Sequence, residues 1–334
     1  MFFSITGFIN RHVLQLLVCV ILFSLAFGYY FPDVGHRLQP LAPFCLFFML
    51  VPMMMGIKLE ELVHTVKRIK LLSIVLIINF LLSPVLAGIL AYYFLSHHPD
   101  FAVGLILLGT VPCAGMTVAW TAMARGNAPI SVVVMAMSYL FGIFLIPFWV
   151  LILAGQYVTV SPYGMVKSVV LIIALPLAVG NLLRLYLTKR WGQAKFDRIK
   201  VTLPAISSFC MYLLFFIALS SGAHQLINHP EYIKAMLIPS LIFYPTLFLA
   251  AAAVCRLGGL DYPDLAAVSY SVTGKNIAVT LALATVFFNP QTVLVTAIMP
   301  VIQVSYMAAF YRLSPTIRKK WGLKKFPKNT ESSP

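Results

Sequence analysis

Residues 266–288 read AAVSYSVTGKNIAVTLALATVFF, an apolar stretch long enough to cross a membrane that carries a lysine, Lys275, near its centre. No other basic residue lies this deep in an apolar stretch of the chain. A cation at the bilayer centre costs about 2.5–3.5 kcal/mol even on the lenient insertion scale, so it persists where it faces a cavity or a pathway. Gly274 beside it permits a helix break, and broken membrane helices build binding sites in transporters. The stretch therefore predicts a membrane transporter with a positively charged centre.

Composition places the whole chain in a membrane. It is 61% hydrophobic and 10% charged over 334 residues, with a mean hydropathy of +0.94, whereas soluble domains are about 25% charged. Since a spanning helix needs about 20 residues, we expect an all-α integral membrane protein. The first apolar run has no small-residue cleavage site after it and is expected to be retained. Ten transmembrane helices are predicted, at 12–31, 41–57, 71–95, 101–124, 129–154, 163–187, 203–222, 233–256, 263–287 and 290–312.

The net charge of +15 is distributed unevenly across these ten helices. With the N-terminus inside, 20 of the 24 Lys and Arg fall on the cytoplasmic side and three fall outside. This split follows the positive-inside rule and predicts a protein of the cytoplasmic (inner) membrane with both termini cytoplasmic. The lipid bilayer, and not a nucleic acid, is the expected partner of the basic surface. The cytoplasmic set is Arg11, Lys58, Lys67, Arg68, Lys70, Arg125, six residues between Arg184 and Lys200, Arg256, and seven between Arg312 and Lys328.

Prolines indicate an internal repeat. Shifting the chain against itself by 161 residues superposes three pairs: Pro43 with Pro204, Pro84 with Pro245, and Pro129 with Pro290. Five helices per repeat is an odd number, so the second repeat is inverted, as in many secondary transporters. We predict a first five-helix repeat at 1–157, a second, inverted one at 158–313, and a basic cytoplasmic tail at 314–334.

The same shift places residues 112–115 (PCAG) of helix 4 opposite residues 273–276 (TGKN) of helix 9. Proline removes a backbone donor and glycine tolerates non-helical dihedral angles. Paired interruptions in two halves point to a substrate site. We therefore expect broken helices 4 and 9 to cross at the membrane midplane around one polar cavity. The alternative is two independent kinks, which membrane helices tolerate.

Several segments resemble the bile acid:sodium symporter superfamily. Residues 124–132 (ARGNAPISV) are similar to the turn between its helices 4 and 5, Asn79-Phe80 followed by Pro84 to its helix 3, and 275–284 to its helix 9. Two further segments resemble the sister branch of arsenite-efflux permeases. These are residues 51–62 (VPMMMGIKLEEL) and 112–120 (PCAGMTVAW), the latter with Cys, Met and Trp in register.

The departures from this resemblance concern ion coupling. Ser271 and Lys275 stand where the symporters carry a glutamate and a glutamine that help to bind sodium, and Ala278 stands where the permeases carry a glutamate. The nine acidic residues lie in loops, near span ends or in the tail. We therefore expect no sodium site and no other metal site, and the usual proton-antiport arrangement is also altered.

Lys275 has two functional interpretations. Desolvation favours the neutral form of an amine, so Lys275 could load and release a proton as the coupling residue. Alternatively, its fixed charge replaces that of sodium and attracts an anionic substrate. A lysine that reaches an interface is the structural alternative, but Lys275 lies 12 residues from Pro263 and 13 from Phe288.

Cys113 is the candidate ligand of a soft substrate, because a thiolate binds soft centres such as As(III). A packing cysteine is the alternative, and the other four cysteines are expected to pack without disulfides or a CxxC site. Neutral polar residues complete the predicted substrate site, although each one could equally make an interhelical hydrogen bond. The substrate-binding set is Cys113, Lys275, Asn276, Thr117, Met116, Gly274, Thr273, Asn79 and Gln303.

The sequence predicts a secondary transporter that works by alternating access, with no cofactor. The leading hypothesis is export of arsenite or a related metalloid, independent of sodium and coupled to protons; the alternative is transport of a small organic anion with Lys275 as its counter-charge. An enzyme is not expected, since no nucleophile–base pair occurs. A receptor or sensor on a transporter scaffold is a further alternative, although no soluble output domain is left over.

Overall fold

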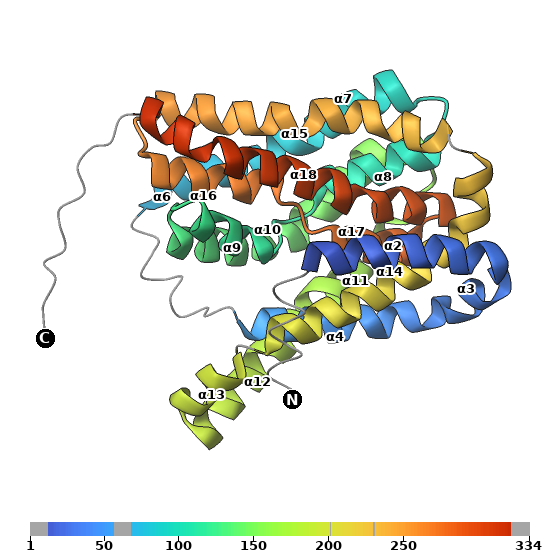
Figure 1. The fold of residues 1–334 in the computed structure, drawn as a ribbon, viewed down its shortest axis with the longest axis horizontal. Helices are drawn as coiled ribbons and strands as arrows, with labels where there is room; N and C mark the ends of the chain where they lie inside the picture. Colours follow the sequence, from blue (N-terminus) through green and yellow to red (C-terminus); the bar gives the residue numbers. More distant parts are fainter. Residues whose placement is uncertain (1–12, 57–67, 201, 230, 322–334) are drawn as a thin grey trace, which may run out of the picture.

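The computed structural model describes residues 13–56, 68–200, 202–229 and 231–321, and the regular elements in these ranges are helices (Figure 1). Arg11, Lys58, Lys67 and the tail beyond Trp321 lie outside the described residues. The α-helices are α2 (Val13–Tyr30), α3 (Pro32–Leu38), α4 (Ala42–Met55), α6 (Ile69–Ile77), α7 (Ser83–Leu95), α8 (Pro99–Thr110), α9 (Met116–Met123), α10 (Ala128–Leu153), α11 (Pro162–Val169), α12 (Leu175–Trp191), α13 (Gln193–Lys200), α14 (Leu203–Asn228), α15 (Glu231–Leu257), α16 (Tyr262–Thr273), α17 (Ile277–Phe287) and α18 (Pro290–Trp321).

The helices form two packed groups. Helices α2, α3, α4, α12 and α14 pack against one another in the lower half of Figure 1, and α6 to α10 pack with α15 to α18 above them. The two groups meet where α4 contacts α17 and α14 contacts α18. Helix α11, which belongs to neither group, contacts α10 and α17. We call them the lower group and the upper group.

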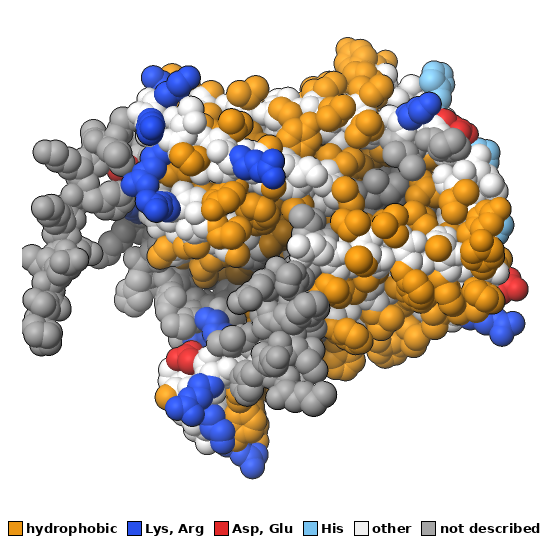
Figure 2. All heavy atoms as spheres, in the orientation of Figure 1, with side chains coloured by type: hydrophobic (Ala, Val, Ile, Leu, Met, Phe, Trp, Pro, Cys, Tyr) orange, Lys and Arg blue, Asp and Glu red, His pale blue; other side chains and the backbone are white. Residues whose placement is uncertain are grey.

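The outer surface is apolar. Large side chains such as Phe144 and Leu249 are 76% and 70% exposed, and hydrophobic side chains cover most of the body in Figure 2. Apolar patches of this extent need a lipid or protein cover. By length and composition, six helical stretches among the described residues can cross a membrane: Pro32–Met55, Ile69–Leu95, Ala128–Gln156, Pro162–Trp191, Gln193–Asn228 and Lys234–Leu257. An all-helical membrane protein is therefore the observed fold class.

Six long spans are found among the described residues where ten were predicted, and two of the four missing ones are the predicted spans 4 and 9. Each is divided into two short helices, α8 with α9 and α16 with α17, so neither half reaches spanning length. By contrast, α6 continues into α7 through a π-helical turn (Ile78–Leu82), and α11 continues into α12 through another (Val170–Ala174).

Basic residues mark one end of the bundle. Lys and Arg gather at the left end of the upper group in Figure 2 and on the projecting α12–α13 hairpin, where the last turns carry Arg256, Arg318, Arg190 and Arg198. Helix α18 extends to Trp321, beyond the predicted end at residue 312. Its last turn is held by contacts of Trp321 with Arg256 and Leu260. The Trp321 indole Nε1 donates to the Leu260 carbonyl oxygen at 2.9 Å.

Candidate functional site: the crossing of two interrupted helices

The two interrupted helices meet at their breaks. Helix α8 ends at Thr110 and α9 begins at Met116, while α16 ends at Thr273 and α17 begins at Ile277. The backbone N–H of Ala114 donates to the Gly274 carbonyl oxygen at 2.7 Å, and the N–H of Asn276 donates to the Pro112 carbonyl oxygen at 2.8 Å. These bonds form an antiparallel bridge between Cys113 and Lys275. Backbone groups released by each break are thus satisfied by the other, as a low-dielectric interior requires.

The halves of each helix lie on opposite sides of this crossing. Helix α9 packs beside α16, and α8 packs beside α17; in Figure 1 the first pair lies to the left of the second. The predicted pairing of residues 112–115 with 273–276 is therefore present as direct contact.

Glycine is needed at the second break because the chains approach closely. A Cβ atom added to Gly274 would collide with the Thr117 methyl group and lie 2.8 Å from the Tyr270 carbonyl oxygen. Gly274 also has non-helical dihedral angles of φ −79° and ψ 66°. It therefore both ends α16 and lets α9 lie against the break.

The side chain of Lys275 is fully buried and reaches three oxygens of neutral groups. Its Nζ donates to Asn79 Oδ1 at 2.9 Å, to the Asn79 carbonyl oxygen at 3.3 Å and to the Gly109 carbonyl oxygen at 3.3 Å. Asn79 lies in the π-helical turn between α6 and α7, a feature often found at functional sites. Lys275 thus joins the second break to the α6–α7 and α8 segments.

Asn276 links the crossing to the lower group. Its Oδ1 accepts the Val279 N–H at 3.1 Å and so caps α17, while its Nδ2 donates to the Tyr139 hydroxyl oxygen. The Tyr139 hydroxyl in turn lies 3.8 Å from the Met53 sulfur on α4. A polar chain therefore runs from the break through α10 to the neighbouring helix group.

Cys113 occupies the first break and is free and fully buried. Its Sγ lies 3.3 Å from Ser138 Oγ on α10. Two thioethers lie beside the same break, since a Cβ atom added to Gly115 would be 2.9 Å from Met53 Cε and 3.7 Å from Met135 Sδ. The first break is therefore rich in sulfur, whereas the second carries a charge.

Of the remaining predicted residues, Gln303 bonds to the crossing, whereas the polar groups of Thr117 and Thr273 bond within their own segments. Gln303 belongs to the crossing, because its Nε2 donates to the Lys275 carbonyl oxygen at 3.0 Å. Thr117 and Thr273 donate their hydroxyls to carbonyls of their own segments, Ala114 and Ser269, both at 2.7 Å. Met116 packs against the hydrophobic core from the start of α9.

Three contributors were absent from the predicted set. Tyr139 bonds to Asn276, Tyr244 donates to Gln303 Oε1 at 3.3 Å, and Gly109 supplies a carbonyl to Lys275. The two tyrosines lie in apolar runs, where an aromatic residue is usually read as wall packing. A backbone carbonyl has no signature in the sequence at all.

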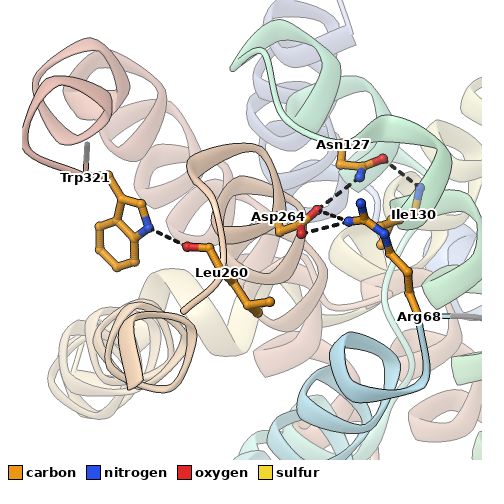
Figure 3. A network of polar contacts seen from close by, with 6 residues as sticks. All are labelled: Arg68, Asn127, Ile130, Leu260, Asp264 and Trp321. Carbon is orange, nitrogen blue, oxygen red and sulfur yellow. Dashed lines mark hydrogen bonds and ion pairs between the residues drawn. The ribbon is translucent and has the colours of Figure 1, made fainter. Parts of the chain in front are cut away.

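A second polar network lies at the basic end of the bundle (Figure 3). Arg68 NH1 donates to both carboxylate oxygens of Asp264, at 2.9 and 2.8 Å, and Asn127 Nδ2 donates to Asp264 Oδ1 at 3.0 Å. The Asn127 Oδ1 caps α10 by accepting the Ile130 N–H at 3.4 Å. The network ties the starts of α6, α10 and α16 together and borders a cavity of about 250 Å³.

Two interrupted apolar helices that cross at a buried polar centre define a membrane transporter of the broken-helix kind. Comparison with known proteins gives the family: residues 43–229 match the sodium bile acid symporter family. The chain belongs to this family, as the sequence resemblance predicted.

Individual relatives show two branches. The chain is 27% identical to the arsenical-resistance protein Acr3 of Corynebacterium glutamicum over 270 residues, which cover 75% of this chain and 71% of that protein. It is 23% identical to Acr3 of Alkaliphilus metalliredigens, over 93% of this chain and 94% of that protein. It is also 29% identical to a probable sodium/metabolite cotransporter, BASS1 of Arabidopsis thaliana, over 65% of this chain and 53% of that protein.

Proposed function

We propose that this protein is a ten-span secondary transporter built from two inverted five-helix repeats. Helix boundaries support the repeat: the starts of α4 and α14 (residues 42 and 203) and of α9 and α17 (116 and 277) are each separated by 161 residues. The antiparallel bridge at the crossing fits the same relation, since inverted repeats run in opposite directions. In this arrangement α8–α9 and α16–α17 each count as one span.

The basic end of the bundle is the cytoplasmic end in this proposal. The clusters at the ends of α12, α13, α15 and α18 support it, because cytoplasmic segments carry the excess of Lys and Arg. Both termini then lie in the cytoplasm, in the inner membrane. The protein has no catalytic role in this proposal.

The substrate is arsenite or a related metalloid, which the protein exports by alternating access. The observation that carries this proposal is the position of Cys113, a buried free thiol within the crossing itself. Sulfur ligands suit a soft metalloid centre. The resemblance to two arsenical-resistance proteins supports the same substrate class.

Alternating access requires the lower group to move against the upper group around the crossing. The contact of the Tyr139 hydroxyl with the Met53 sulfur spans the two groups. A thioether is a weak hydrogen-bond acceptor, so this contact breaks at small cost when the groups separate. Lys275 is the coupling residue of the cycle: it loads and releases the proton that drives transport. The cycle needs no sodium.

Transport of a small organic anion is the second candidate function. It is favoured by the fully buried ammonium of Lys275 in the crossing and by the similarity to a probable sodium/metabolite cotransporter. The three oxygens around Lys275 Nζ count against it, because they already occupy the ammonium's donors.

Arsenite accumulation in cells that lack their own efflux system tests the proposal. Cells that express the wild type are expected to accumulate less arsenite than empty cells. The Cys113→Ser variant should accumulate as much as empty cells, because a hydroxyl is a poor ligand for a soft centre. Cys255→Ser is the matched control, since Cys255 is equally buried but lies on α15.

Equal accumulation in wild-type and empty cells would reject the metalloid substrate and favour an organic anion. A lower accumulation that survives in Cys113→Ser would keep arsenite as the substrate and remove the thiol from its binding site.

A further inference from the structure

The three oxygens around Lys275 form a cradle that is organised independently of the lysine. The Asn79 side chain is oriented by its own Nδ2, which donates to the Ser271 carbonyl oxygen at 3.2 Å. The Gly109 carbonyl oxygen also accepts the Ser83 hydroxyl at 2.8 Å. Other hydrogen bonds therefore fix the amide and the carbonyl that face the ammonium.

Close helix packing brings the Gly109 carbonyl into place. A Cβ atom added to Gly109 would lie 2.5 Å from Ala87 Cβ and 3.0 Å from the Ser83 carbonyl oxygen. Glycine thus lets α8 approach α7 closely enough for its final turn to face the cradle. The oxygens of the cradle belong to the π-helical turn and α8, and Lys275 enters it from the α16–α17 break.

The chemistry of the cradle suits a monovalent cation. Its oxygens come from an amide and two peptide carbonyls, the ligand type that replaces the hydration shell of alkali ions in selective pores. Divalent ions instead recruit carboxylates. Ser271, whose carbonyl accepts the Asn79 Nδ2, also has a buried hydroxyl. Its Oγ has no hydrogen-bond partner among the described residues.

We propose that the cradle of Asn79 and Gly109 is a monovalent-cation site whose resident occupant is the tethered ammonium of Lys275. While Lys275 carries its proton, the positive charge holds the α16–α17 break against the π-helical turn and α8, so the cradle needs no metal ion from solution. Shortening the Lys275 side chain vacates the cradle and creates a site for a free ammonium, alkylammonium or alkali-metal ion.

Thermal unfolding of purified protein in detergent tests this site. The Lys275→Ala variant is measured in sodium, potassium, ammonium and methylammonium chloride, with N-methylglucamine chloride holding the ionic strength constant. In N-methylglucamine chloride the unfolding midpoint of Lys275→Ala should be lower than that of the wild type. At least one of the small cations should raise the variant's midpoint by several degrees and saturably, since a ligand that binds only the folded state stabilises it. The wild type should show no such dependence.

Lys275→Met is the matched control, because its flexible apolar chain fills the same space without a charge. It should be insensitive to the cation. Adding Asn79→Ala to Lys275→Ala removes the amide oxygen and should raise the half-saturating cation concentration at least tenfold. If Lys275→Ala cannot be purified, Lys275→Ser, purified in ammonium chloride, replaces it.

Several outcomes would overturn the proposal. One is a Lys275→Ala midpoint that is the same in every salt, and another is an equal response in Lys275→Met. The proposal also fails if neither short variant can be purified in any of these salts while Lys275→Met can. Because unfolding needs no substrate, a wild type without arsenite flux would reject the proposed substrate and leave this result unchanged.

Discussion

The same two parts of the chain are joined twice by a cation, once in the buried centre and once at the end of the bundle. In the centre, Lys275 beside α17 donates to Asn79 between α6 and α7; at the end, Arg68 before α6 donates to Asp264 in α16. The Lys275 side chain is 0% exposed and meets neutral oxygens, whereas Arg68 is 55% exposed and meets a carboxylate.

This difference shows where a charged contact matters for the stability of this fold. Water and salt screen the outer pair, and exposed ion pairs contribute little. In the centre Lys275 is shielded from water and, among the described residues, donates to no carboxylate, so the ammonium depends on oriented dipoles. The two contacts should therefore respond very differently to mutation.

The largest effect is expected from Lys275→Met. It leaves Asn79 Oδ1, the Asn79 carbonyl and the Gly109 carbonyl in a buried site without the ammonium's donors. Each unsatisfied buried group costs about 1–3 kcal/mol, and Gly109 keeps the Ser83 hydroxyl. The two Asn79 oxygens therefore predict a loss of about 2–6 kcal/mol. Unfolding in detergent measures it.

The opposite result would be informative. Replacing buried charges with apolar groups stabilises some proteins. A Lys275→Met variant at least as stable as the wild type would show that the crossing does not need the charge for its folding.

A middle-sized effect is expected from glycine replacement at the two breaks. Gly274→Ala places a methyl group against the Thr117 methyl and the Tyr270 carbonyl, and overpacking of this kind costs about 1–3 kcal/mol. Gly115→Ala meets chiefly the terminal methyl of Met53, which is flexible, so its cost should be smaller. Thermal midpoints of the two variants measure this difference.

Thr117→Ser provides the control within the same contact. It removes the methyl group that Gly274→Ala would strike and keeps the hydroxyl that donates to Ala114. The double variant should recover part of the lost stability, and the Tyr270 carbonyl limits the recovery. Strict additivity of the two substitutions would contradict the proposed clash.

The helix breaks could be predicted from the sequence more clearly than the groups that contact them. Pro112 and Gly274 interrupt helices for local reasons, so both interruptions and their pairing could be predicted from residue type and spacing. The cradle could be predicted only in part. Asn79 has a side chain to recognise, but the Gly109 carbonyl comes into place through close helix packing, which no local pattern encodes.

The end of the last span was also predicted wrongly because tertiary contacts set it. The predicted end of the last span at residue 312 followed the onset of charge, whereas α18 continues to Trp321. Its last turn is held by tertiary contacts: the Trp321 indole bonds to Leu260, and the Arg256 guanidinium lies 5.5 Å from the centre of the Trp321 ring. Hydropathy alone contains neither contact.

The smallest effect is expected from Arg68→Ala, which removes the outer cation. Arg68 is more than half exposed, and exposed pairs contribute about 0.2–1 kcal/mol in double-mutant cycles. Because salt screens exposed charges, the difference from wild type should shrink when the ionic strength is raised, as measured by thermal midpoints at low and high salt. Lys70→Ala is the matched control: it removes the same charge from the same end, but Lys70 donates to the Gly258 carbonyl at 2.9 Å and not to a carboxylate. A loss on Arg68→Ala as large as that of Lys275→Met, and equally insensitive to salt, would show that the end network fixes the helices as firmly as the crossing does.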